Sequence, residues 1–173
     1  MIEFARHPLR IAHISVRSET HGEDDVLAVD LKLSFELPNT VLDFLSPSLR
    51  GSLFDAANDP DIFTGEDGPP LTRVRHPQLG TLRWSQTWRE MRLCLHTGAR
   101  PRDDLAFDAV TFGRLTLRPR EGGTVAFVAR AQVHPRTEAV TAKLVTLLKH
   151  EVPATLDASE ATDEATDDGE ADE

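Results

Sequence analysis

Arginine and tryptophan gather in one segment of the chain, residues 73–102. The segment holds seven arginines against one acidic residue, Glu90, and it contains both tryptophans of the protein. Guanidinium groups bind phosphates, and indole rings stack on nucleobases, each stack contributing about 1–3 kcal/mol. This composition predicts a surface for single-stranded nucleic acid. The residues expected to form it are Arg75, Arg83, Trp84, Trp88, Arg89 and Arg92.

The same pattern has a second interpretation that involves no ligand. An indole on a strand is often buried, and arginines often line the wet face of the same strand with their aliphatic stems against the protein. Trp84 would then belong to the core, and the arginines would only solvate the surface. The two interpretations differ in whether Trp84 and Trp88 are exposed beside the arginines.

Residue patterns typical of enzymes are sparse. Cys94 and His96 lie two residues apart on an expected strand and so share a face, but a nucleophilic thiol also needs an orienting third group, and no such group is identified. The chain has no glycine-rich phosphate loop, no His-Glu-x-x-His and no Cys-x-x-Cys pair. We therefore predict a protein that is not an enzyme and that has no cofactor and no metal site. With a single cysteine, an internal disulfide is excluded.

The net charge of −10 comes from one end of the chain. Residues 157–173 carry nine acids and no base, which leaves 20 acids against 19 bases in residues 1–156. A segment so acidic and so poor in apolar residues cannot bury enough surface to offset its ordering entropy. We expect one globular domain over residues 1–156 and a disordered acidic tail over residues 157–173. The tail would regulate access to the basic surface, or would serve only to keep the protein soluble.

Alternating apolar residues predict a protein made mostly of strands. Residues 26–37 alternate strictly, and residues 9–17 are expected to pair with them as an antiparallel hairpin. A second hairpin is expected from residues 105–117 and 124–133. Apolar residues change parity within residues 82–97, so a bulge or turn is expected near Arg89 and Glu90.

Helices are expected at two places. After the second strand, Asn39 or Thr40 should cap a short helical run, and Ser46 followed by Pro47 should start another over residues 47–54. Residues 136–150 show apolar spacings of three and four, which predict an amphipathic helix with Thr137 or a neighbouring polar residue at its start. Residues 55–70 should form an exposed loop, and residues 152–156 a last edge strand.

These elements together predict a β-rich α+β fold. Its centre would be an antiparallel β-barrel or sandwich, of which the oligonucleotide-binding barrel is one form. Short helices would follow the second strand, and one amphipathic helix would lie near the C-terminal end.

Two resemblances extend these expectations. A β-barrel body followed by an acidic terminus resembles the layout of phage and bacterial single-strand-binding proteins, although many of those end in an aromatic or apolar residue and this chain ends in Asp172 and Glu173. The phrases His21-Gly22-Glu23 through Asp30-Leu31 and Gly122-Gly123 through Gln132-Val133 look like those of uncharacterised phage or prophage proteins. Both resemblances imply an accessory role in replication or recombination.

Other functions fit the same composition. One is an interaction or inhibitor protein that contacts a host protein through its acidic tail or loop, and another is a component of virion assembly. The sequence predicts no membrane segment and no secretory signal, so a cytoplasmic protein is expected, with self-association left open.

Overall fold

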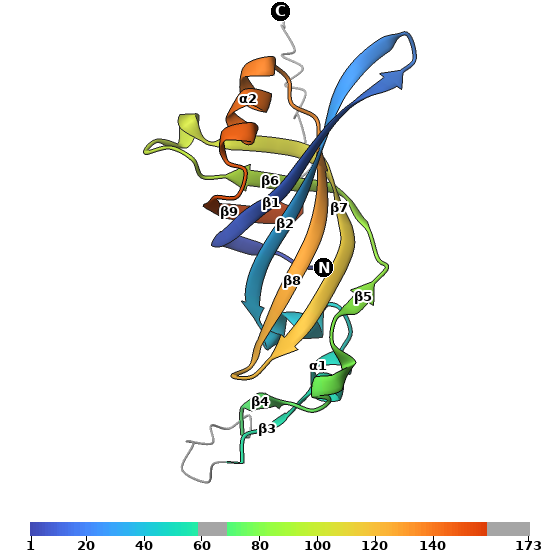
Figure 1. The fold of residues 1–173 in the computed structure, drawn as a ribbon, viewed down its shortest axis with the longest axis vertical. Helices are drawn as coiled ribbons and strands as arrows, with labels where there is room; N and C mark the ends of the chain where they lie inside the picture. Colours follow the sequence, from blue (N-terminus) through green and yellow to red (C-terminus); the bar gives the residue numbers. More distant parts are fainter. Residues whose placement is uncertain (59–68, 159–173) are drawn as a thin grey trace, which may run out of the picture.

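The computed structural model describes residues 1–58 and 69–158 of the chain (Figure 1). Antiparallel strands dominate it, and its helices are short. The strands are β1 (Phe4–His21), β2 (Asp24–Pro38), β3 (Phe54–Ala56), β4 (Leu71–Val74), β5 (Leu82–Trp84), β6 (Trp88–Leu95), β7 (Leu105–Arg120), β8 (Thr124–Val133) and β9 (Glu151–Ala158). The helices are α1 (Leu49–Leu53), α2 (Glu138–Thr146) and three short 3-10 turns, η1 (Asn39–Phe44), η2 (Pro77–Leu79) and η3 (Pro101–Asp103).

Six strands close into a barrel. Around the ring the order is β1, β2, β8, β7, β6 and β9, and β9 pairs again with β1, every pairing being antiparallel. Strand β5 pairs with β7 outside the ring. Of the two architectures predicted from sequence, the barrel is the one found. The ring has six strands, one more than the oligonucleotide-binding barrel.

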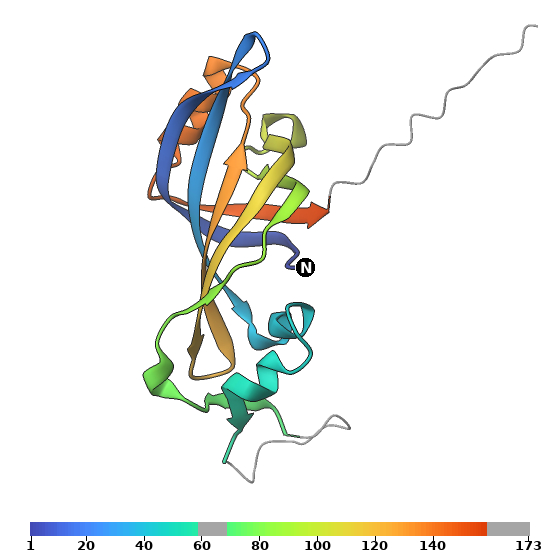
Figure 2. The same cartoon turned by 90° about the vertical axis from the view of Figure 1, so that its right-hand side faces the viewer.

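Bulges bend the long strands so that the ring can close. Register shifts occur at five places in the barrel ladders, and all but the one between Ile11 and His13 contain a residue with positive φ. These residues are Arg6 in β1, Glu90 in β6, and Ala109 and Arg114 in β7. Bulges increase twist and turn corners in barrels, which is their role here. Figure 2 shows β1 curving from its pairing with β9 into the long hairpin with β2.

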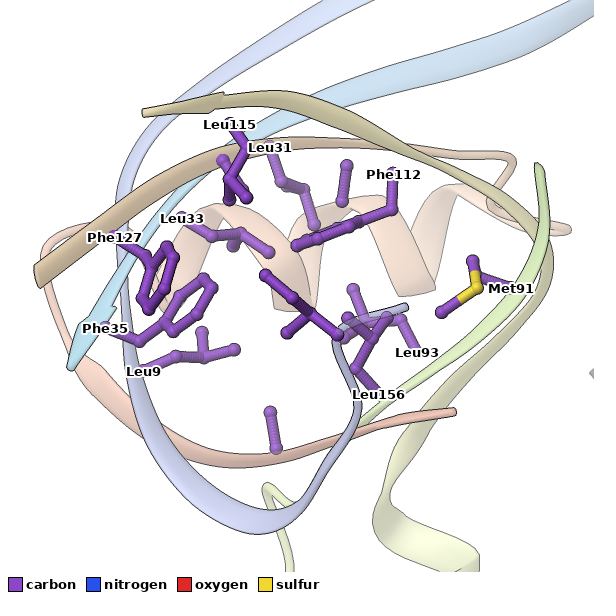
Figure 3. Packing of buried hydrophobic residues seen from close by; sticks show 14 of the residues in the cluster. Leu9, Leu31, Leu33, Phe35, Met91, Leu93, Phe112, Leu115, Phe127 and Leu156 are labelled. Carbon is purple, nitrogen blue, oxygen red and sulfur yellow. The ribbon is translucent and has the colours of Figure 1, made fainter. Parts of the chain in front are cut away.

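The core fills the inside of the barrel (Figure 3). Its side chains come from every strand of the ring, since alternate residues point inward. Phe35 of β2 and Phe127 of β8 are cross-strand partners whose rings stack with centroids 5.5 Å apart. Leu93 of β6 and Leu156 of β9 are completely buried on the opposite side.

The hairpins predicted from sequence are confirmed. Strands β1 and β2 pair across Gly22, and β7 and β8 pair across Gly122 and Gly123. Strand β8 has the expected bounds, and the other three strands run further than expected. The parity change in residues 82–97 is confirmed as well. Strand β5 ends at Trp84, β6 begins at Trp88, and a bulge at Glu90 restores the apolar phase.

Helix α2 closes one end of the barrel, behind the core side chains in Figure 3. It begins at Glu138, and the Thr137 hydroxyl accepts a hydrogen bond from the Val140 amide at 3.3 Å, which confirms the predicted cap. Leu144 is completely buried, as expected for the apolar face. The helix is shorter than predicted, because residues 147–150 form a turn that leads directly into β9.

The predicted caps of the first two helical turns are wrong. Neither η1 nor α1 has a side-chain cap, and α1 follows Ser48 rather than Ser46. Asn39 is instead buried, and its side chain makes tertiary hydrogen bonds. Its amide nitrogen donates to the Leu71 carbonyl at 2.6 Å, and its oxygen accepts from Arg50 Nε at 3.2 Å. The asparagine joins β4 to the barrel, which is a tertiary contact that no local pattern encodes.

Strand β9 is not the edge strand that its short apolar pattern indicated. It lies between β6 and β1 and pairs with both, so it closes the barrel. It also includes Asp157 and Ala158, two residues that were assigned to the tail. The rest of the predicted tail, residues 159–173, and most of the predicted loop, residues 59–68, lie outside the described residues.

Candidate nucleic-acid interface

Trp88 cannot serve as a stacking platform in this structure. Its exposed fraction is only 9%, and its ring packs against Phe112 with centroids 6.0 Å apart. The bulge at Glu90 explains the inward direction, because one extra residue puts Trp88 and Met91 on the same buried face although they are three residues apart. The prediction that Trp88 contacts bases is therefore wrong.

Strand β5 carries two further residues predicted to bind nucleic acid. Trp84 packs against the core and is half-buried, and its indole nitrogen donates to Gln86 Oε1 at 3.3 Å. Arg83 alternates with it and is exposed. Trp84 and Arg83 thus point to opposite sides of β5, so they do not form the mixed surface that the sequence suggested.

The other predicted arginines lie apart from one another. Arg75, just after β4, holds Asp55 with two contacts of 2.7 and 2.8 Å, and this hydrogen bond lowers the pKa of the Asp55 carboxyl. Arg92 in β6 lies 3.7 Å from Asp108. Arg89 is exposed next to the bulge of β6. The predicted six-residue surface is therefore not assembled, and only Arg83 belongs to the basic surface that the barrel does form.

That surface arises from the register of β2, β8 and β7. Lys32 of β2 lies directly opposite Arg130 of β8, and Arg130 lies opposite Gly113 of β7, next to Arg114. Thr116 of β7 is the cross-strand partner of Arg83 in β5. We call the five cations on this surface the basic face; they are Lys32, Arg83, Arg114, Arg118 and Arg130.

Every member of the basic face points to solvent. The neighbours of Lys32 and Arg130 along their strands are buried leucines and alanines, so the two cations face outward. Within residues 1–58 and 69–158, no carboxylate lies within 4.0 Å of any of the five cations. Strands β2, β8, β7 and β5 lie side by side in Figure 1, so the charges share one side of the barrel.

A recess of about 320 Å³ opens in the basic face. Arg114 and Arg130 lie on its walls together with Arg17. Arg17 forms ion pairs with Asp30 at 3.1 Å and with Glu19 at 2.8 Å. Asp30 also lines the recess, with Thr87, Thr111, Gly113 and Gln132. The Asp30 carboxylate is paired with Arg17, and the Gln132 amide donates to Glu19. The guanidinium groups of Arg114 and Arg130 and the hydroxyls of Thr87 and Thr111 are the donors suited to a phosphate.

Gly113 makes the recess possible. A Cβ at this position would meet Thr87 Oγ1 at 2.7 Å and two carbons of the same side chain at 3.1 Å. Because glycine has no side chain, the segment between β5 and β6 can lie directly on β7 beside Arg114. The glycine thus places the Thr87 hydroxyl at the recess.

Sequence patterns contained only part of this surface. Strict alternation in β2 and β8 already indicates that Lys32 and Arg130 face water. Their adjacency depends on the pairing of β2 with β8, two strands separated by more than eighty residues, and no local signal specifies it. The outward position of Arg114 depends in addition on the bulge of β7, in which this residue has a positive φ.

A second polar cluster lies on the outer side of β6. Cys94 Sγ lies 3.8 Å from His96 Nδ1, and the same nitrogen lies 2.8 Å from Asp104 Oδ2. Asp104 is the orienting group that sequence alone did not identify. A nucleophilic triad needs the thiol and the carboxylate on different ring nitrogens, whereas here both share Nδ1. Burial, and then the charge of Asp104, raise the pKa of the Cys94 thiol, so this geometry does not activate a nucleophile.

No helix in the described part of the chain combines the length and the apolar character needed to cross a membrane. No protein-family model, no curated protein and no solved structure matches the chain.

Proposed function

We propose that this protein is a non-enzymatic module that binds single-stranded nucleic acid through its phosphate backbone, across the basic face. The observation that carries the proposal is the arrangement of Lys32 directly opposite Arg130, with no described carboxylate within 4.0 Å of either. Like charges at directly opposed positions of an antiparallel pair destabilise the fold. An arrangement that costs stability in this way is expected where a polyanion binds.

The shape of the surface favours a single strand over a duplex. The basic face follows the curvature of a closed barrel through β2, β8, β7 and β5. Duplex DNA has a persistence length of about 150 base pairs and bends at considerable cost, whereas a flexible single strand follows a curved surface. One phosphate would occupy the recess between Arg114 and Arg130, and its neighbours would reach Lys32 and Arg118.

Bases contribute little to this mode of binding. Trp88 is buried, Trp84 is half-buried, and the aromatic residue with the largest exposure among the described ones, Phe44, lies in η1 rather than on a strand of the basic face. Without stacking, affinity comes from phosphate contacts, which carry no sequence information. We expect binding that is indifferent to sequence and strongly dependent on salt.

Charge reversal tests the proposal directly. The full chain and the double variant Lys32→Glu/Arg130→Glu would be titrated into a fluorescent oligonucleotide at low salt, and binding followed by anisotropy. We expect the variant to lose at least about a hundredfold in affinity, since each of the two charged contacts contributes about 1.5–3 kcal/mol. A matched control is Arg100→Glu/Arg102→Glu, which changes the net charge by the same amount, because both are exposed arginines at η3, away from the basic face.

Each alternative result has a clear meaning. If wild-type protein binds no oligonucleotide at low salt, the proposed function is wrong. If Lys32→Glu/Arg130→Glu and Arg100→Glu/Arg102→Glu weaken binding equally, the protein binds by net charge alone and the basic face is not a site. A preference for duplex over single strand would contradict the argument from curvature.

A further inference from the structure

The Cys94 cluster, which we define as Cys94, His96 and Asp104, brings a thiol, an imidazole and a carboxylate together. Their potential ligand atoms all lie within 4.8 Å of one another. Cys94 lies in β6, His96 directly follows the last residue of that strand, and Asp104 immediately precedes β7, the strand that pairs with β6. On the other side, Thr155 of β9 is the cross-strand partner of Cys94.

Tertiary structure places Asp104 at this position. Residues 97–103 fold back between β6 and β7, with the Thr97 hydroxyl donating to the Asp103 carbonyl at 2.9 Å. A Cβ at Gly98 would overlap the Asp103 side chain, so only glycine allows the loop to be this tight. The loop therefore delivers the Asp104 carboxylate to His96 rather than to solvent.

The Asp104 carboxylate has one oxygen that can accept a further hydrogen bond or bind an ion. The Asp104 side chain is 90% buried, with 10% of its surface exposed, and its Oδ2 contacts His96 Nδ1. Its other oxygen, Oδ1, is buried without a hydrogen-bond partner within 3.5 Å in the described residues, although the amides of Gly98 and Thr97 lie near the carboxylate. A buried oxygen without a partner beside a thiol and an imidazole calls for an additional group at this position.

We propose that the Cys94 cluster binds a divalent transition-metal ion of the zinc class, through Cys94 Sγ, His96 Nδ1 and a carboxylate oxygen of Asp104. Zinc takes sulfur, imidazole nitrogen and carboxylate oxygen together, in tetrahedral geometry with water at a fourth position. Its bond lengths imply ligand atoms roughly 3.5 Å apart. The observed 3.8 Å between Sγ and Nδ1 and 2.8 Å between Nδ1 and Oδ2 bracket that spacing.

Thr155 supports the tautomer of His96 that metal binding requires. The Thr155 hydroxyl lies 2.8 Å from His96 Nε2 and accepts a hydrogen bond from the Arg6 amide. When Nδ1 carries the proton and donates to Asp104, the hydroxyl donates to Nε2. When a metal ion takes the lone pair of Nδ1, Nε2 carries the proton and donates to the hydroxyl. One hydroxyl thus satisfies both states, and binding releases the thiol proton of Cys94 to solvent.

An ion can reach the cluster from solvent. His96 lines a recess of about 350 Å³ that is bounded by the end of α2 and the start of β9. His96 is the member of the cluster that lines this recess, and its side chain is 13% exposed. The recess therefore gives an ion a path from solvent to His96, next to the half-buried Cys94.

Cobalt titration tests the site without reference to nucleic-acid binding. The full chain would be stripped with a chelator under reducing conditions and titrated with Co²⁺, and absorption from thiolate-to-metal charge transfer would be recorded. We expect one equivalent of Co²⁺ to give this absorption and Zn²⁺ to remove it by displacement. In Asp104→Asn the apparent affinity should fall at least about tenfold, and in Cys94→Ser the charge-transfer band should vanish.

Asp103→Asn is the matched control, because it neutralises the neighbouring carboxylate, which is not in the cluster. This variant should bind Co²⁺ with wild-type affinity. Circular dichroism would establish that each variant is folded, and Asp104→Asn keeps the test decisive if Cys94→Ser unfolds. Absence of the band at a tenfold excess of Co²⁺ would overturn the proposal. So would wild-type affinity in Asp104→Asn, or Co²⁺ binding without the band, because the ion would then be held elsewhere.

Discussion

Neutralising Lys32 and Arg130 should change the salt dependence of oligonucleotide binding by an amount that the structure specifies. The basic face has five cations, and the logarithm of affinity for a single strand falls by about 0.7 per neutralised phosphate for each decade of salt. If each cation contacts one phosphate, the wild-type slope is about −3.5, and Lys32→Gln/Arg130→Gln lowers its magnitude to about 2.1. Between 50 and 200 mM salt, affinity then falls roughly 100-fold for wild type and roughly 20-fold for the variant.

Stability of the same variant separates lost contacts from misfolding. Lys32 and Arg130 face each other across β2 and β8, so removing both charges relieves a repulsion. The free energy of unfolding should stay constant or rise by up to about 1 kcal/mol. Urea denaturation followed by tryptophan fluorescence measures this change, since Trp88 is buried in the core.

The assay is an anisotropy titration at four or five salt concentrations for wild type, Lys32→Gln/Arg130→Gln and a control, Arg102→Gln. The control should keep the wild-type slope. An unchanged slope in the double variant would refute the assignment of phosphate contacts to Lys32 and Arg130, even if its affinity were lower. A loss of unfolding free energy would show instead that these cations contribute to folding.

Three further predictions follow from particular contacts. Gly113→Ala should destabilise the fold by about 1–3 kcal/mol in urea denaturation, because its Cβ would collide with Thr87, and Thr87→Ala should restore part of the loss. The hydrogen bond from His96 lowers the pKa of the Asp104 carboxyl in the folded protein below its ordinary value of 3.8. The ionised carboxylate therefore stabilises the fold fully above pH 3.8, and this stabilisation is lost as the pH falls through the lowered pKa. In Asp104→Asn, the urea midpoint should consequently depend less on pH in the acid range. Truncation after Ala158 removes eight acids and no base, so anisotropy at low salt should show tighter binding of an oligonucleotide. An unchanged affinity would mean that these acids do not influence the basic face.

Local patterns in the sequence determined the strands and the direction of most side chains. Strict alternation in residues 26–37 and 124–133 was enough to predict both strands and to place Lys32 and Arg130 on the wet side. The parity change near Glu90 was enough to predict the bulge, because a strand with one buried face must keep its apolar residues on that face. The Thr137 cap was likewise predictable from sequence, since capping depends on residues three or four positions apart.

Only the tertiary structure decided which of these residues meet. Trp88 is buried because the bulge turns it onto the apolar face, whereas composition alone had grouped it with the arginines. Asp104 and Thr155 join Cys94 from two different neighbours of β6, and Lys32 meets Arg130 through the pairing of β2 with β8. Strand pairing and barrel closure join segments far apart along the chain, and the many alternative registers share the same local alternation. The choice among them is made by the packing of the whole core, which is why the positions of the basic face and of the Cys94 cluster on the barrel surface were not predictable from sequence alone.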